Sequence, residues 1–138
     1  MTEQMSTKFK VIEVGIGLAD SSFISYNRDW DRLEVILLTW DERKLILRFF
    51  NPAYFFDNDC DHTTQLRQAL SVTPLISAVI KRDYDEIKKI NSYKHYQILD
   101  LNDEPALEII CEGFDTPQIV DLLPEERFLV ERRFFNPS

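Results

Sequence analysis

The stretch LEVILLTWDERKLILRFF spans residues 33–50 and contains two apolar runs separated by the polar residues 41–43. Both runs are rich in branched and aromatic residues and are apolar on both faces, which is typical of strands in the middle of a sheet. The short polar link predicts an antiparallel hairpin. Proline has no backbone N–H and cannot continue a ladder, so we expect the second strand to end at Asn51, before Pro52.

Similar patterns on either side of this hairpin predict further strands. Apolar residues at every second position from Ile12 to Leu18 would share one face of a strand, so a strand is expected over residues 8–18. A second hairpin is expected between residues 96–101 and residues 106–112. A short strand at residues 23–26 and a charged edge strand at residues 128–134 complete the set.

The apolar period changes to a helical one between residues 64 and 91. Apolar side chains there are spaced three and four apart, a pattern that indicates a helix with one buried face. We expect a first helical piece capped by Asp61 or Thr63. A second piece is expected to begin at Pro74 with Thr73 as its cap, because proline is favoured at the first position of a helix.

The order of strands, helices and strands points to the α+β class. We expect a mostly antiparallel sheet of two hairpins plus the N-terminal strand, with the central helices packed on one face. A short helix at residues 117–122 is expected before the last strand. The chain fits a single globular domain over residues 1–138, in which residues 1–7 and 136–138 are expected to be flexible ends.

Composition limits the kinds of partner. The chain has 138 residues, 44% hydrophobic and 29% charged, as in ordinary soluble globular domains. Its net charge of −8 disfavours nucleic acid and is compatible with a basic protein partner. We recognise neither a membrane-spanning run nor a secretory signal, so no membrane partner is expected. Only two cysteines are present, which favours reduced thiols and a cytoplasmic location.

Acidic residues dominate the last third of the chain, and no Lys or Arg occurs between His95 and Arg127. The second hairpin carries acids at its turn and along one face, near aromatic side chains that could anchor a partner. We therefore predict a non-enzymatic interaction module that binds a basic protein. Small acidic immunity or inhibitor proteins are analogous in size, charge and composition. The alternative is that the charges only keep the domain soluble. The predicted contact residues are Tyr96, Asp100, Asp103, Glu104, Glu108, Glu112 and Phe114.

A second hypothesis concerns the loop that runs from Asp57 to His62. Its oxygen ligands Asp57, Asp59 and Asp61 have the spacing with which a calcium loop begins. Such loops need glycine at the sixth position and glutamate at the twelfth, where this chain has His62 and Gln68. The alternatives are zinc or another transition metal held by these aspartates with Cys60 and His62, with metal-assisted hydrolysis, or a solvated loop that extends the acidic face. No other cofactor is expected.

No catalytic constellation stands out. A nucleophilic mechanism needs a Cys or Ser beside a base, and the only histidines are His62 and His95. Cys111 falls on a predicted core strand, where a thiol is usually a small buried apolar group. We therefore expect no enzymatic activity unless the acidic loop holds a metal.

The motif RFFNP occurs twice, at residues 48–52 and 133–137. We interpret both copies as strand ends followed by a turn, because asparagine before proline favours turns and the flanking residues do not match. The alternative is that the apolar pair Phe134-Phe135 docks on a partner or on a second copy of the chain. A structural homo-oligomer is therefore a third hypothesis for the function.

Overall fold

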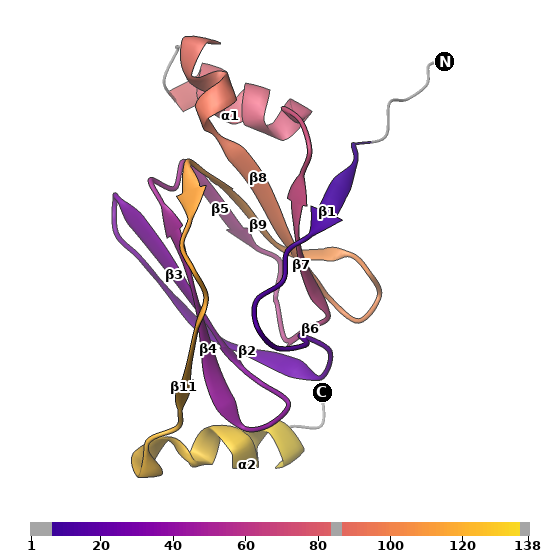
Figure 1. The fold of residues 1–138 in the computed structure, drawn as a ribbon, viewed down its shortest axis with the longest axis vertical. Helices are drawn as coiled ribbons and strands as arrows, with labels where there is room; N and C mark the ends of the chain where they lie inside the picture. The colour runs from indigo at the N-terminus through magenta and orange to yellow at the C-terminus, as the bar shows by residue number, and fades with distance from the viewer. Residues whose placement is uncertain (1–6, 84–86, 136–138) are drawn as a thin grey trace.

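The computed structural model describes residues 7–83 and 87–135, and Figure 1 shows how they are arranged. Strands dominate, and every strand pair in the described residues is antiparallel. No helix in this part of the chain is both long and apolar enough to cross a membrane. The expected flexible ends, residues 1–7 and 136–138, lie outside the described residues except for Thr7.

The predicted central hairpin is confirmed. It consists of β3 (Arg32–Leu38) and β4 (Arg43–Phe50), which pair over their whole length. Glu42 lies in the tight link with a positive φ of 67°. Alternate residues of both strands are fully buried, because their side chains all point to the same side of the sheet. These buried side chains are Leu33, Val35, Leu37, Leu45, Leu47 and Phe49.

The hairpin is the middle of one sheet, whose strand order is β10-β4-β3-β2-β6. The short segments β10 and β11 lie one after the other along the outer edge of β4. The additional strands are β2 (Ser21–Arg28), β6 (His62–Thr63), β10 (Gly113–Phe114) and β11 (Gln118–Asp121).

The second sheet has the order β1-β7-β8-β9-β5. Its middle is the predicted second hairpin, which is also confirmed, since β8 and β9 pair around the loop at residues 100–104. The strands of this sheet are β1 (Phe9–Val11), β5 (Tyr54–Asp57), β7 (Gln65–Ala69), β8 (Lys94–Leu99) and β9 (Pro105–Cys111).

The two sheets face each other around one main core. The chain alternates between them from β4 to β7, so the layers are joined at their corners and curl into a half-barrel. Leu47 and Phe49 of β4 meet Ile98 of β8 and Ile109 of β9 in this core, and all are fully buried. Burial of such side chains contributes on the order of 1.5–3 kcal/mol each.

A smaller core lies on the outer face of the second sheet, beneath α1 (Pro74–Asp83). Ile76, Val79 and Ile80 of the helix pack there with Tyr93 and with Ile110 of β9. The predicted start of this helix is confirmed, because the Thr73 hydroxyl accepts a hydrogen bond from the backbone N–H of Ile76 at 3.2 Å. The 3₁₀ helix η1 (Ile87–Ser92) then leads into β8.

The α+β prediction is wrong. The protein is mostly antiparallel β, and α1 covers only one end of a sheet. The expected first helical piece is strand β7. Leu66 and Ala69, three residues apart, are both buried because both faces of β7 are covered, Leu66 by the main core and Ala69 on the opposite face. Burial on both faces of this strand therefore produced a three-residue spacing of apolar side chains, which is also typical of a helix.

Three further elements differ from the prediction. Only Phe9–Val11 of the expected first strand is a strand. Residues 12–18 form a loop, in which Gly15 has a φ of +90° and Val14 and Leu18 are buried in the main core. The expected helix at residues 117–122 is instead β11, which pairs with the open edge of β4.

The expected edge strand at residues 128–134 is the helix α2 (Phe128–Phe135), which follows the 3₁₀ turn η2 (Pro124–Glu126). The helix lies at the opposite end of the molecule from α1 (Figure 1). The two RFFNP copies therefore differ: the first ends β4, with Asn51 at a φ of 49°, whereas residues 133–135 of the second are helical. The rest of the second copy, residues 136–137, lies outside the described residues.

Candidate acidic interaction surface

The fold brings two acidic loops together at one end of the second sheet. One loop joins β5 to β6 (residues 58–61), and the other joins β8 to β9 (residues 100–104). The backbone N–H of Asn58 donates to the carbonyl of Ala106 at 2.8 Å. The Thr64 hydroxyl donates to the carbonyl of Asp100 at 3.1 Å. These contacts place side by side two stretches that are about forty residues apart in the sequence.

We call the carboxylates of the two loops and of the adjoining strand end the acidic loop surface. Most of them are exposed, and Asp57 and Asp100 are half-buried. Neither loop contains Lys or Arg. Within the described part of the chain, their one ion-pair partner is His62, whose Nε2 lies 3.6 Å from a carboxylate oxygen of Asp61. The acidic loop surface comprises Asp57, Asp59, Asp61, Asp100, Asp103 and Glu104.

Local hydrogen bonds shape both loops. Asp57 Oδ1 accepts from the backbone N–H of Cys60 at 2.9 Å. Asp100 Oδ1 accepts from the N–H groups of Asn102 and Glu104, at 2.8 and 3.1 Å. Aspartate favours such turns because its short side chain reaches its own backbone. The half-buried carboxylates therefore hold the loops in shape, and the exposed ones remain available to a partner.

The electrostatic effect of these loops is visible at Cys60. Burial, followed by repulsion from Asp57, Asp61 and Asp100, raises the pKa of the Cys60 thiol to about 12. At neutral pH the thiol is therefore protonated, which makes Cys60 a poor nucleophile. Asp57 and Asp61 lie at the first loop and Asp100 lies at the second, so carboxylates of both loops are close enough to Cys60 to raise its pKa.

The metal hypothesis receives no geometric support from the described residues. In residues 7–83 and 87–135, no group of three His, Cys, Asp or Glu side chains converges in a way that could hold a metal ion. Asp57 is turned toward the backbone of its own loop, and Asp59 lies at the loop tip with a φ of 53°. The Asp57–His62 segment thus contributes negative charge to the surface without forming a ligand cage.

Four predicted contact residues lie away from the acidic loop surface. Two of them, Tyr96 and Phe114, belong to or pack against the main core, and their ring centroids lie 5.6 Å apart. Glu112 lies at the far end of β9 and accepts a hydrogen bond from Asn51 at 2.6 Å. Glu108 lies in the middle of β9, on the outer face of the second sheet. The structure therefore brings together the turn residues of the predicted set and separates the rest.

Glu108 belongs instead to a partly buried polar network that the sequence did not indicate. His95 Nε2 lies 2.7 Å from Glu108 Oε1, and Gln97 donates to the same oxygen at 2.9 Å. The other ring nitrogen of His95, Nδ1, lies 2.9 Å from the Thr73 hydroxyl. Arg67 donates to Gln97 Oε1 at 2.8 Å. The network joins the cap of α1 to β7, β8 and β9.

The protonation pattern of the network follows from its acceptors. The hydrogen bond from His95, opposed by partial burial and aided by Gln97, holds the pKa of Glu108 below its usual value. Because the ionised carboxylate only accepts, His95 Nε2–H is the donor, and in the neutral ring the Thr73 hydroxyl donates to Nδ1. A hydroxyl–imidazole–carboxylate series resembles a nucleophile relay, but Thr73 is 3% exposed and caps a helix. We therefore assign this network to anchoring α1.

Comparison of the chain with protein-family models, with curated proteins and with solved structures finds no match.

Proposed function

We propose that the protein is a non-enzymatic interaction module that binds a basic protein through the acidic loop surface. The observation that carries this proposal is the meeting of two acidic loops, neither of which contains a compensating Lys or Arg. The partner would present a surface rich in Lys or Arg to these carboxylates. Small acidic inhibitor or immunity proteins have a similar size and charge, and this is an analogy of chemistry alone.

The support for this proposal comes from electrostatics. A dense group of like charges on a chain with a net charge of −8 attracts a cationic partner over roughly a Debye length, about 8 Å at physiological salt. Such steering raises the association rate and selects the sign of the partner's charge. Leu101, 63% exposed in the same loop as Asp100 and Asp103, supplies an apolar contact beside the charges.

The backbone suggests a variant that removes charge without disturbing the loops. Asp59 and Asp103 have positive φ values, of 53° and 60°, a conformation that asparagine tolerates well. The test variant is therefore Asp59→Asn, Asp103→Asn and Glu104→Gln, which leaves the shaping carboxylates Asp57 and Asp100 in place. Exposed ion pairs contribute about 0.2–1 kcal/mol each, so three lost pairs should weaken binding by roughly 3- to 150-fold.

A matched control removes three charges elsewhere. Asp29 and Asp31 are exposed at the β2–β3 tip, at the opposite end of β2 from His62, and Asp121 is exposed at the end of β11. The control variant is Asp29→Asn, Asp31→Asn and Asp121→Asn. Each protein is immobilised and exposed to lysate of the native host, and bound proteins are eluted with salt and identified by mass spectrometry.

The proposal predicts that wild type and the control variant retain the same basic protein and that the test variant loses it. Equal retention by all three would refute the acidic loop surface as the binding site. Retention of only acidic or neutral proteins by the wild type would refute the basic-partner proposal itself.

A further inference from the structure

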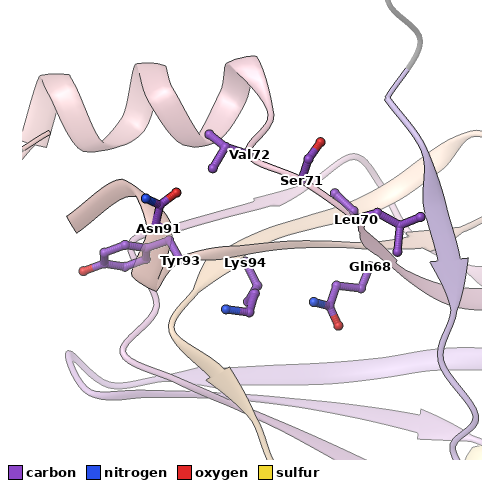
Figure 2. Close-up of a pocket in the computed structure, with 8 residues that line it drawn as sticks. Gln68, Leu70, Ser71, Val72, Asn91, Tyr93 and Lys94 are labelled. Carbon is purple, nitrogen blue, oxygen red and sulfur yellow. The ribbon is translucent and has the colours of Figure 1, made fainter. Parts of the chain in front are cut away.

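A second feature lies at the other end of the second sheet, away from the acidic loops. A cleft of about 440 Å³ opens between the end of β7, its link to α1, and the segment that leads from η1 into β8. Figure 2 shows the side chains around it, with Gln68 and Lys94 extending to the same side of the two strands. The size falls in the range of small-molecule sites in proteins.

Hydrogen-bond donors without partners line this cleft. In the part of the chain that the structure describes, no carboxylate pairs with the Lys94 ammonium group. Among the same residues, the side chains of Gln68, Ser71 and Asn91 form no hydrogen bond. Gln68 pairs in register with Tyr96, which places it diagonally beside Lys94 on the same face of the sheet. The cleft therefore offers the Lys94 ammonium group and the Gln68 amide on one side of the strands, and the Asn91 amide and the Ser71 hydroxyl on the other.

The local charge of the cleft is positive although the chain is acidic. The stretches that line it, residues 68–72 and 91–94, contain Lys94 and no Asp or Glu. Lys10 of β1 lies directly opposite Gln68 in the antiparallel register and adds a second cation beside the cleft. The residues that line the cleft include no carboxylate that could neutralise the positive charge of Lys94. A negatively charged group would form a stronger hydrogen bond with Lys94 than a neutral one, so the lining favours an anionic ligand.

The cleft also has an apolar part. Leu70 and Val72 are 58% and 39% exposed, although they flank a link packed between a strand and a helix. We propose that this cleft binds a small organic anion, whose carboxylate or phosphate group meets Lys94 and the Gln68 amide and whose apolar portion covers Leu70 and Val72. This site differs from the acidic loop surface in position, charge and ligand, so either can exist without the other.

Three small probes test the proposal by titration of the isotopically labelled protein, observed through its backbone amide NMR signals. Butyrate carries the expected charge and apolar tail, butyramide is its neutral counterpart of the same shape, and inorganic phosphate supplies the alternative charged group. We expect butyrate or phosphate to shift the signals of Gln68, Ser71, Asn91 and Lys94 with millimolar affinity, and butyramide to shift them much less. The tighter of the two anions identifies the headgroup.

Lysine variants distinguish a built site from general attraction. Lys94→Gln should weaken binding at least about tenfold, because a charged hydrogen bond is lost. Lys94→Arg keeps the charge and should retain most of the affinity. Lys81→Gln is the matched control, since Lys81 is exposed on α1 and does not line the cleft. The proposal is overturned if neither anion shifts the cleft signals, if butyramide acts as strongly as butyrate, or if Lys81→Gln weakens binding as much as Lys94→Gln.

Discussion

The substitution Thr73→Val should destabilise the protein strongly although it changes no side-chain shape. It removes the hydroxyl that caps α1 at Ile76, which contributes about 1 kcal/mol. It also leaves Nδ1 of His95 without its partner at a site only 5% exposed, which costs about 1–3 kcal/mol. Valine is branched like threonine, so packing is retained. The free energy of unfolding should therefore fall by about 2–4 kcal/mol.

Equilibrium unfolding in urea, followed by circular dichroism, measures this effect. With a slope of about 2 kcal/mol per molar urea, the midpoint should fall by roughly 1–2 M. Thr116→Val makes the same chemical change at an exposed position and should alter stability by less than about 0.5 kcal/mol. A double-mutant cycle with Glu108→Gln should show coupling, because His95 links the two side chains. A loss below about 0.5 kcal/mol for Thr73→Val would refute the anchoring role of the network.

Three other predictions concern separate parts of the fold. The pKa of Glu108 is lowered in the folded state, so its stabilising contribution is complete above its ordinary pKa of 4.5 and is lost as the pH falls below it. The stability difference between wild type and Glu108→Gln should therefore shrink as the pH falls below 4.5, and a difference independent of pH would contradict this. With a pKa of about 12, Cys60 should react with iodoacetamide at pH 8 roughly a thousandfold more slowly than in the urea-unfolded chain, and equal rates measured by mass spectrometry would rule out the shielded thiol. Trp30 and Trp40 are 89% and 57% exposed, so the wavelength of maximum tryptophan emission should change little on unfolding; a large red shift would mean that an indole is buried.

The sequence predicted best the elements whose pattern depends on neighbours in the chain. The hairpin at residues 33–50 has an apolar run on each side of a short polar link, and both strands form where expected. The helix that begins at Pro74 carried its own start signal in Thr73. Such signals lie within a few residues, so they can be recognised without knowledge of the tertiary fold.

The errors arose where distant contacts decide the structure. β7 is buried on both faces, so its apolar spacing gave no reliable period. β11 forms because β4 has an edge to pair with, a fact that residues 117–122 alone do not reveal. Tertiary context therefore overrode local preference at these positions.

The candidate surface was partly predictable, because some of its residues belong to a hairpin that local sequence signals indicate. The acids of the β8–β9 turn follow from a local hairpin, and the aspartates of residues 57–61 were expected to extend the same face. Their meeting depends on the pairing of β5 with β9, over fifty residues apart in the sequence. Tyr96 was placed on the surface from its aromatic character, and its inward direction depends on the facing sheet. The link from His95 to Thr73 had no sequence signal, since it crosses from a strand to a helix cap.

The most direct test of the acidic loop surface is the association rate of the captured basic partner, measured by surface plasmon resonance over a series of salt concentrations. For wild type and for the Asp29, Asp31 and Asp121 control variant, the rate should fall steeply as salt rises, because screening removes the steering field. For the Asp59, Asp103 and Glu104 variant, the rate should be low already at low salt and should depend on salt much less. Identical rates and salt dependence for all three proteins would contradict the account.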